Sequence, residues 1–206
     1  MLQFNSLRPD TLDVLKLTMS EPALNDFTLV GGTALALHFG HRISEDVDLF
    51  TWQKFDVDFL LNELSTKLNF TIKIKTPIGA HLFIEQVKTD LVYFPIKPIR
   101  DTIIKDGVRL LQLDDLAAMK LNAIANRGAK KDFYDLFFLL EAYPIEKLIE
   151  LFAEKFKQQD VFGLTRSIGY FADADEEETQ IIVLKDKKLT WEKVKQKILI
   201  ETHKIL

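Results

Sequence analysis

The chain has 206 residues, of which 47% are hydrophobic, and a formal net charge of −4 at pH 7. This length and composition can bury one substantial core, or two modest ones, and the charge argues against broad binding of DNA or other nucleic acid. The absence of cysteine excludes a disulfide framework and thiolate zinc sites, and we expect a cytoplasmic protein with no membrane span or export leader.

Helices and strands alternate in the first half of the predicted chain. In chain order we expect a helix over 9–17, a strand over 27–30, a helix over 33–39, a strand over 47–51, a helix over 56–68 and a strand over 70–75. Pro77 and Gly79 predict a turn. The segment 81–95 is typical of a hairpin arm or of a long bent strand.

After about Leu113 the pattern becomes mainly helical. We expect helices from Asp114 or Asp115 to Gly128, then over 131–142, 145–158, 163–171 and 191–203, the last one capped by Thr190. The predicted fold class is therefore α+β. We expect a mixed sheet with flanking helices to form an α/β domain over 1–112, and an α-helical domain over 113–206 to complete a cleft with it.

Two glycines between the strand at 27–30 and the next helix predict an anion site. Gly31 and Gly32 lack a Cβ atom, so the backbone can turn sharply and bring its N–H groups against an anion. Thr33 is predicted to cap the following helix, whose N-terminus favours a phosphate.

Asp46 and Asp48 lie in an apolar strand just after this bend. Strand alternation puts both carboxylates on one face, where they can share a divalent cation. The chain holds two other Asp-x-Asp pairs. Asp56 and Asp58 are predicted to begin a helix, and the pair at 173 and 175 is predicted to lie in a solvated acidic loop.

Metal-assisted chemistry on phosphates favours a third acid. Asp90 lies among apolar residues of the segment 81–95, where alternation puts it on one face with Lys88 and Val92. The alternative is a strand-edge acid that faces water. With the upstream motif, Asp90 is a better candidate than Glu85.

The helix after Leu113 carries two cations on one side. Lys120 and Arg127 are seven residues apart, so both point the same way and suit a triphosphate, or else simply face water. The next helix is apolar almost all round and carries Asp132 and Asp135. For these acids we expect an ion-pair latch to Arg127 and Lys131.

Two blocks of this sequence resemble one known family. Gly-Gly-Thr at 31–33 and Gly-His-Arg-Ile-Ser-Glu-Asp-Val-Asp-Leu-Phe at 40–50 resemble the signature of AbiEii/AbiGii-type toxin nucleotidyltransferases, in the DNA-polymerase-β-like nucleotidyltransferase superfamily. Lys120, Arg127 and Asp-Phe-Tyr-Asp at 132–135 are similar to that family's downstream elements. Lys131 departs from the pattern, since Arg is more usual there, and Lys cannot offer a planar bidentate fork.

The resemblance implies a nucleotidyltransferase-type sheet and a Mg²⁺-dependent (or Mn²⁺-dependent) transfer of an NMP from an NTP to an acceptor hydroxyl. The implied metal ligands are Asp46, Asp48 and Asp90. Nucleotide contacts would come from Gly31, Gly32, Thr33, Arg42, Ser44 and Arg127, with Lys120 as a catalytic cation and Asp132 and Asp135 in support.

The resemblance also implies the toxin of a toxin–antitoxin or abortive-infection system that defends against phage. tRNA is then a candidate acceptor, and an antitoxin encoded nearby is a candidate partner. Two other functions stay open: a catalytically silent nucleotide-binding or partner-binding module, and an enzyme that modifies a protein or a small molecule such as an antibiotic. A basic rim for phosphates could come from Lys73, Lys75, Lys97, Arg100, Lys105 and Arg109.

Overall fold

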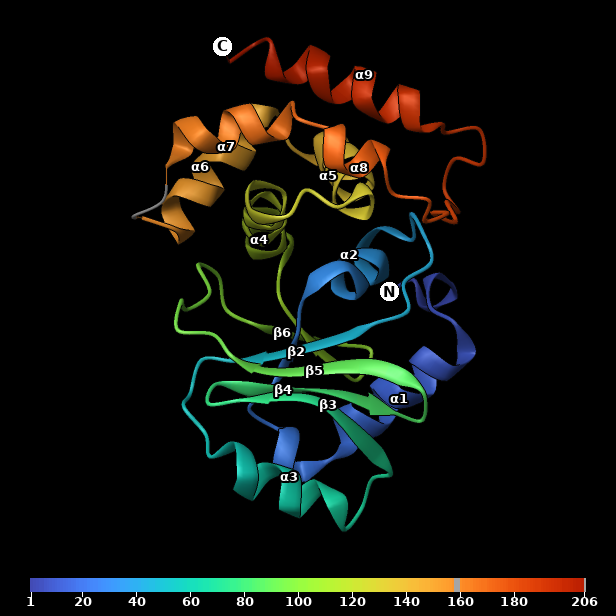
Figure 1. The fold of residues 1–206 in the computed structure, drawn as a ribbon, viewed down its shortest axis with the longest axis vertical. Helices are drawn as coiled ribbons and strands as arrows, with labels where there is room; N and C mark the ends of the chain where they lie inside the picture. The colour runs from blue at the N-terminus through green and yellow to red at the C-terminus, as the bar shows by residue number, and fades with distance from the viewer. Residues whose placement is uncertain (158–159, 206) are drawn as a thin grey trace. The chain divides into compact units, whose positions relative to one another are not determined.

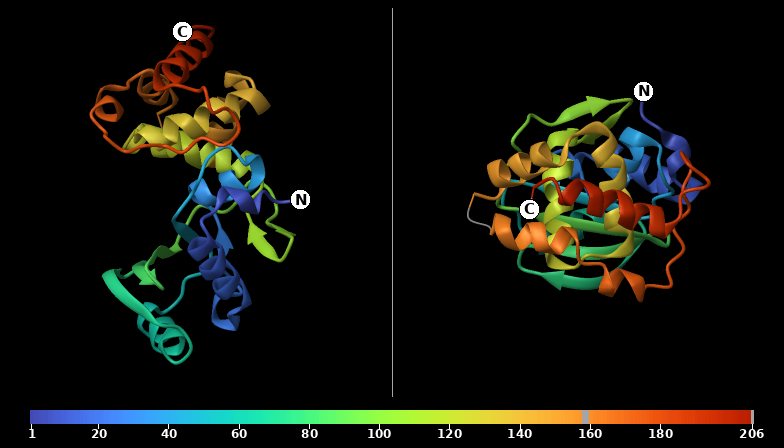
Figure 2. Two further views of the ribbon diagram at one scale, coloured as in Figure 1. Left: turned by 90° about the vertical axis from the view of Figure 1, so that its right-hand side faces the viewer. Right: turned by 90° about the horizontal axis from the view of Figure 1, so that it is seen from above.

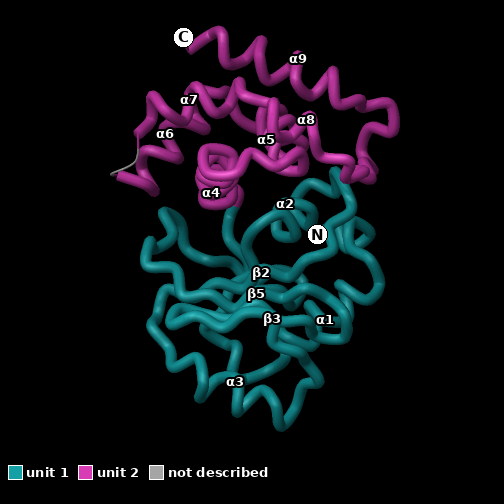
Figure 3. Tube along the Cα trace, in the orientation of Figure 1, with its two compact units in different colours: residues 1–112 teal, residues 113–206 magenta. Residues whose placement is uncertain are grey.

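The computed structural model describes residues 1–157 and 160–205. Contacts among residues divide the chain into two compact units, Met1–Gln112 (unit 1) and Leu113–Leu206 (unit 2), which Figure 3 colours separately. In the described residues, strands occur in unit 1 only, and unit 2 is built from helices. The fold is therefore mixed α+β, as the sequence predicts.

Unit 1 is built on one mixed sheet. Its strands are β1 (Thr28–Leu29), β2 (Val47–Thr51), β3 (Phe70–Thr76), β4 (Gly79–Ile84), β5 (Val87–Tyr93), β6 (Ile103–Lys105) and β7 (Val108–Leu110). They form a seven-stranded sheet in the order β3-β4-β5-β2-β1-β7-β6 (Figure 1). β2 runs parallel to β5 and β1 runs parallel to β7, whereas the other neighbouring strands are antiparallel.

Helices lie on both faces of this sheet. They are α1 (Pro9–Ser20), α2 (Gly31–Phe39) and α3 (Val57–Ser65), with short 3-10 turns at Phe4–Ser6 and Pro22–Leu24. α1 and α3 lie on one face and α2 on the other (Figures 1 and 2). Along β2, Val47 and Leu49 are fully buried, while Asp48 and Phe50 on the opposite face are partly exposed. Strand alternation thus turns Asp48 away from the apolar core.

Unit 2 contains the helices α4 (Leu113–Asn126), α5 (Lys130–Ala142), α6 (Ile145–Lys155), α7 (Val161–Ile168), α8 (Ala172–Asp175) and α9 (Trp191–Thr202). α4 packs against α5, α6 and α7, and α9 packs against α5. The ring of Trp191 contacts Phe133 and Tyr134, and its Nε1 donates a hydrogen bond to Asp175 at 2.6 Å. These aromatic contacts attach α9 to the rest of the unit.

Several predicted elements differ from the structure. Of the two alternatives for the segment 81–95, the hairpin is present as β4–β5, whereas the hairpin β6–β7 was not predicted. Asp173 and Asp175 are exposed, as predicted, but they belong to α8 rather than to a loop. The helix predicted over 163–171 lies instead at Val161–Ile168. α6 ends at Lys155, and the predicted end at residue 158 lies outside the described residues.

Candidate active site

The glycine bend lies directly against one of the predicted metal ligands. α2 begins at Gly31, which has a φ of +70°, a conformation that favours glycine. A Cβ atom on Gly31 would lie 2.2 Å from Oδ2 of Asp48. Glycine is therefore required at position 31 for two reasons: the backbone angle is positive, and the Asp48 carboxylate occupies the space that a side chain would need.

Thr33 does not cap α2, so that prediction is wrong. The N-cap residue is Val30, without a side-chain cap, and Thr33 lies within the first turn of the helix. The Thr33 hydroxyl instead donates a hydrogen bond to the backbone carbonyl of Asp46 and lies 2.8 Å from the Ser44 hydroxyl. Both hydroxyls are buried and fix the loop that leads into β2, so they position Asp46.

Asp48 and Asp90 lie side by side on neighbouring strands. They are direct partners in the parallel pairing of β2 with β5. Partners in a parallel pair share a face of the sheet, and Asp46 lies just before β2, two residues from Asp48. The structure therefore brings acids from two strands together beside Gly31.

Two basic side chains contact Asp90 that the sequence analysis did not assign to the site. Nδ1 of His81 lies 2.8 Å from Oδ1 of Asp90, and Nζ of Lys88 lies 3.5 Å from Oδ2. The His81 contact is close but is not aligned as a hydrogen bond, since Oδ1 is buried without a hydrogen-bond partner among the described residues. Lys88 could have been found from strand alternation, whereas His81 requires the register of the β4–β5 hairpin.

The charges around Lys88 are dominated by these acids. Burial by itself lowers the pKa of the Lys88 ammonium, but the carboxylates of Asp46, Asp90 and Asp48 more than offset burial and raise that pKa above its usual value. The charges of all three predicted metal ligands therefore act on the Lys88 ammonium. This part of the sheet face attracts cations.

The three carboxylates fit a divalent cation in ligand type and in charge. Oxygen ligands of this kind suit Mg²⁺ and Mn²⁺. As they stand, however, no three acidic or histidine side chains of the described residues are arranged as a cluster that could hold a metal ion. The carboxylate of Asp90 is occupied by His81 and Lys88 instead.

In unit 2, Lys120 joins α4 to α5. Its Nζ lies 2.8 Å from Oδ1 of Asp132 and 2.8 Å from Oδ2 of Asp135, and its side chain is only 5% exposed. Nε of Arg127 lies 2.9 Å from Oδ2 of Asp132. The predicted ion-pair latch is thus present between Arg127 and Asp132, and Lys120 is a further cation in it. Lys120 was predicted to neutralise phosphate charge, with Asp132 and Asp135 in support, and these two acids are the partners found on its ammonium.

Two predicted cationic contacts face the protein interior. Arg42 is 4% exposed, and its Nη1 donates to the carbonyl of the next residue, Ile43, at 3.0 Å. Arg109 donates to three backbone carbonyls, at Met19, Leu24 and Phe27. Arg109 therefore anchors the end of α1 and the segment that follows it to β7, and its proposed place in a basic rim is wrong.

A family model described as nucleotidyl transferase AbiEii toxin of a type IV toxin–antitoxin system matches residues 17–204. The chain belongs to the AbiEii family. Its members are nucleotidyltransferase toxins, and the matched span includes Gly31, the three acids and the latch of unit 2.

Three individual proteins are similar to this AbiEii chain. An uncharacterised protein of Aquifex aeolicus strain VF5 (aq_aa25) is 32% identical over 200 residues, which are 92% of this chain and 93% of that protein. The crystal structure of JHP933 from Helicobacter pylori superimposes with a TM-score of 0.58 at 20% identity, and it covers 97% of this chain and 93% of its own. A candidate nucleotidyltransferase from H. pylori gives a TM-score of 0.57 at 19% identity over 96% and 95% of the two chains. These two structures share the fold.

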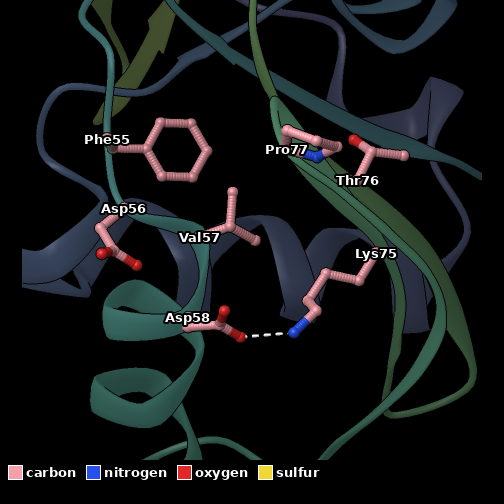
Figure 4. A pocket seen from close by; sticks show the side chains of 7 residues that line it. All are labelled: Phe55, Asp56, Val57, Asp58, Lys75, Thr76 and Pro77. Carbon is pink, nitrogen blue, oxygen red and sulfur yellow. Dashed lines mark hydrogen bonds and ion pairs between the residues drawn. The ribbon is translucent and has the colours of Figure 1, made fainter.

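One cavity in unit 1 lies apart from the predicted site residues. This cavity of about 470 Å³ lies between the start of α3 and the end of β3 and is lined in part by Phe55 and Pro77 (Figure 4). At its edge, Nζ of Lys75 lies 2.5 Å from Oδ1 of Asp58. Asp56 is the N-cap of α3, as predicted, and accepts a hydrogen bond from the N–H of Phe59. The acids of this second Asp-x-Asp pair thus have structural partners.

No helix in the described part of the AbiEii chain combines the length and the apolar character that a membrane crossing requires.

Proposed function

We propose that this AbiEii chain transfers an NMP from an NTP to an acceptor hydroxyl in a metal-dependent reaction. One observation carries the proposal: Asp48 and Asp90 are neighbours on one sheet face, and Gly31 lies against the Asp48 carboxylate at the start of α2. A helix N-terminus with free backbone N–H groups beside an acidic pair suits a triphosphate and its cations.

Asp46, Asp48 and Asp90 would hold Mg²⁺ or Mn²⁺. When bound, the ion supplies positive charge to the phosphates and lowers the pKa of the attacking hydroxyl. Because the hydroxyls of Thr33 and Ser44 have partners within the protein, the phosphate contacts of Gly31, Gly32 and Thr33 would come from backbone N–H groups. Ser44 would act by holding the loop in place.

The acceptor oxygen would form a new bond to the α-phosphorus while the bond to the β-phosphate oxygen breaks and pyrophosphate leaves. Asp90 lies on the strand beside Asp48 and would receive the proton of the hydroxyl. In unit 2, the exposed Arg127 would be available to a phosphate, while Lys120, buried against Asp132 and Asp135, would hold α4 to α5 and so position Arg127. Arg42 would support the loop before β2 from its buried position.

The test is transfer of label from α-³²P NTPs in the presence of Mg²⁺. Replacing Asp48 with Asn keeps the shape of the side chain and removes its charge, so we expect transfer to fall on the order of 10²-fold or more. The matched control is Asp58→Asn, which changes an acid of the second Asp-x-Asp pair and leaves transfer unchanged. Equal activity of Asp48→Asn and the wild type would refute the metal role.

The acceptor class follows from where the label goes. As a family member, the chain acts in the context of a type IV toxin–antitoxin system, and we propose tRNA as the acceptor and an antitoxin encoded nearby as the partner. Label recovered in RNA supports this acceptor, whereas label in protein or in small molecules assigns the transfer to one of those classes.

A second candidate is a nucleotide-binding module without catalysis. It is favoured by the contacts of Asp90 with His81 and Lys88, which occupy a carboxylate that catalysis requires for the metal. Metal-dependent NTP binding with no transfer to any fraction would support this second candidate.

A further inference from the structure

Lys88 lies inside the acidic part of the sheet face. It is on β5, two residues before Asp90 and on the same side of the strand. Its Nζ lies 3.5 Å from Oδ2 of Asp90, and its side chain is 40% exposed. The ammonium is therefore close to the acids and has solvent on one side.

Three carboxylates in a small region repel one another, and a positive charge among them relieves that repulsion. Without a metal ion, Lys88 supplies such a charge. A divalent cation that binds the same carboxylates meets Lys88 as a competitor of like charge.

We propose that Lys88 is a resident counter-ion of Asp90, which a divalent cation must displace from that carboxylate before it can bind all three predicted ligands. This inference rests on the metal site of the proposed function. Lys88 is a positioning residue here, because it acts on the carboxylates rather than on the reacting atoms.

Displacement has a second consequence. The side chain of Lys88 is long and partly exposed, so its ammonium can leave the carboxylates and reach an anion nearby. The triphosphate of an NTP supplies that anion. Metal and nucleotide should therefore each raise the affinity of the other, and the two effects must be equal because the coupling is reciprocal.

The experiment measures Mn²⁺ binding to the full chain by electron paramagnetic resonance, with and without each of the four α,β-methylene NTP analogues. We expect Lys88→Met to bind Mn²⁺ alone about tenfold more tightly than the wild type, because one opposing charge is gone. The analogue should raise the Mn²⁺ affinity of the wild type and have a smaller effect on this variant. Lys88→Gln, which is neutral but polar, should behave like Lys88→Met and serves if the latter does not fold.

Two further variants serve as controls. Lys88→Arg keeps the positive charge and should bind Mn²⁺ as the wild type does. Lys73→Met removes a lysine of β3 whose Nζ lies over the ring of Phe83 at 5.9 Å, and it should leave Mn²⁺ affinity unchanged. A general effect of net charge would change Lys73→Met and Lys88→Met alike, and that result would overturn the proposal.

Unchanged or weaker Mn²⁺ binding by the neutral Lys88 variants would also overturn the proposal, while the proposed function would stand on label transfer. The opposite outcome, in which the proposed enzyme fails but the role of Lys88 stands, gives a different result. Tighter binding by Lys88→Met together with no transfer by any protein would support the role of Lys88 and refute the enzyme. Absence of Mn²⁺ binding to the wild type would refute both.

Discussion

At the scale of single residues, two glycines with similar backbone angles have different surroundings. Gly31 and Gly107 have φ values of +70° and +80°. A Cβ atom on Gly107 would meet no atom within 4 Å, whereas on Gly31 it would overlap the carboxylate of Asp48. Replacing each glycine with alanine therefore separates two costs. At position 107 only the backbone angle is unfavourable, whereas at position 31 the new Cβ atom also crowds the Asp48 carboxylate.

We predict that Gly31→Ala abolishes nucleotide transfer and that Gly107→Ala does not. Each should lose about 1–2 kcal/mol of unfolding free energy, because alanine disfavours a positive φ. Gly31→Ala should lose more, since Asp48 must also move. Urea unfolding and label transfer, measured on both variants, check this. Full activity of Gly31→Ala would contradict the close approach to Asp48.

Local rules predicted those residues whose role depends on nearby sequence. Asp56 caps α3 as expected, and Asp90 shares a strand face with Lys88. The partners of Lys120 were not predictable in the same way. Its contacts with Asp132 and Asp135 depend on how α4 packs on α5, and residue spacing along one helix carries no information about that packing. The contact of His81 with Asp90 was missed for the same reason.

At the scale of elements, the two hairpins differ in how well their turns are encoded. The β6–β7 turn contains Asp106-Gly107, a strong hairpin signal that the sequence analysis overlooked. The β4–β5 turn contains Glu85 and Gln86, with φ values of 46° and 72°. Neither residue favours a positive φ. No local signal therefore distinguished this hairpin from one bent strand.

We predict that Gln86→Gly stabilises the protein by about 1 kcal/mol, because glycine adopts a positive φ without steric cost. Asp106→Gly relieves a similar angle, φ 50°, but removes the carboxylate that accepts a hydrogen bond from the N–H of Leu2 at 2.6 Å. It should gain less or lose stability. Thermal unfolding of both variants checks the difference, and a lower midpoint for Gln86→Gly would contradict it.

At the scale of the whole molecule, the division of secondary structure was readable from the sequence. Period-two alternation, as in Phe70–Thr76, gives way to helical periodicity after about Leu113, and the described strands all precede Gln112. The order of the strands was not readable. The pairing of β2 with β5 joins segments about 40 residues apart, and it is this pairing that makes Asp90 a neighbour of Asp48.

We predict that low pH decreases the free energy of unfolding, because it protonates Asp132 in the ion-pair latch of unit 2. Burial raises the pKa of Asp132, but Lys120 and Arg127 outweigh burial and hold that pKa below its usual value. A carboxyl of this kind stabilises the fold above its unfolded pKa of about 3.9, and the contribution is lost as the pH falls through the lower folded value.

Asp132→Asn should therefore cost about 3–5 kcal/mol at pH 7, because Lys120 and Arg127 lose a buried partner. The difference from the wild type should shrink below pH 4. Chemical unfolding across pH measures it, with the exposed Asp173→Asn as the control that shows a much smaller difference. A gap between wild type and Asp132→Asn that stays constant with pH would show that the charge of Asp132 is unimportant.

The position of β3 at the end of the sheet has a consequence for the protein in concentrated solution. A terminal strand offers unpaired backbone groups to any other chain, and β3 also carries half-exposed isoleucines at 72 and 74. Lys73 and Lys75 alternate with them. When two copies approach along this strand, the ammonium groups of Lys73 meet and repel, and this repulsion opposes stacking into aggregates.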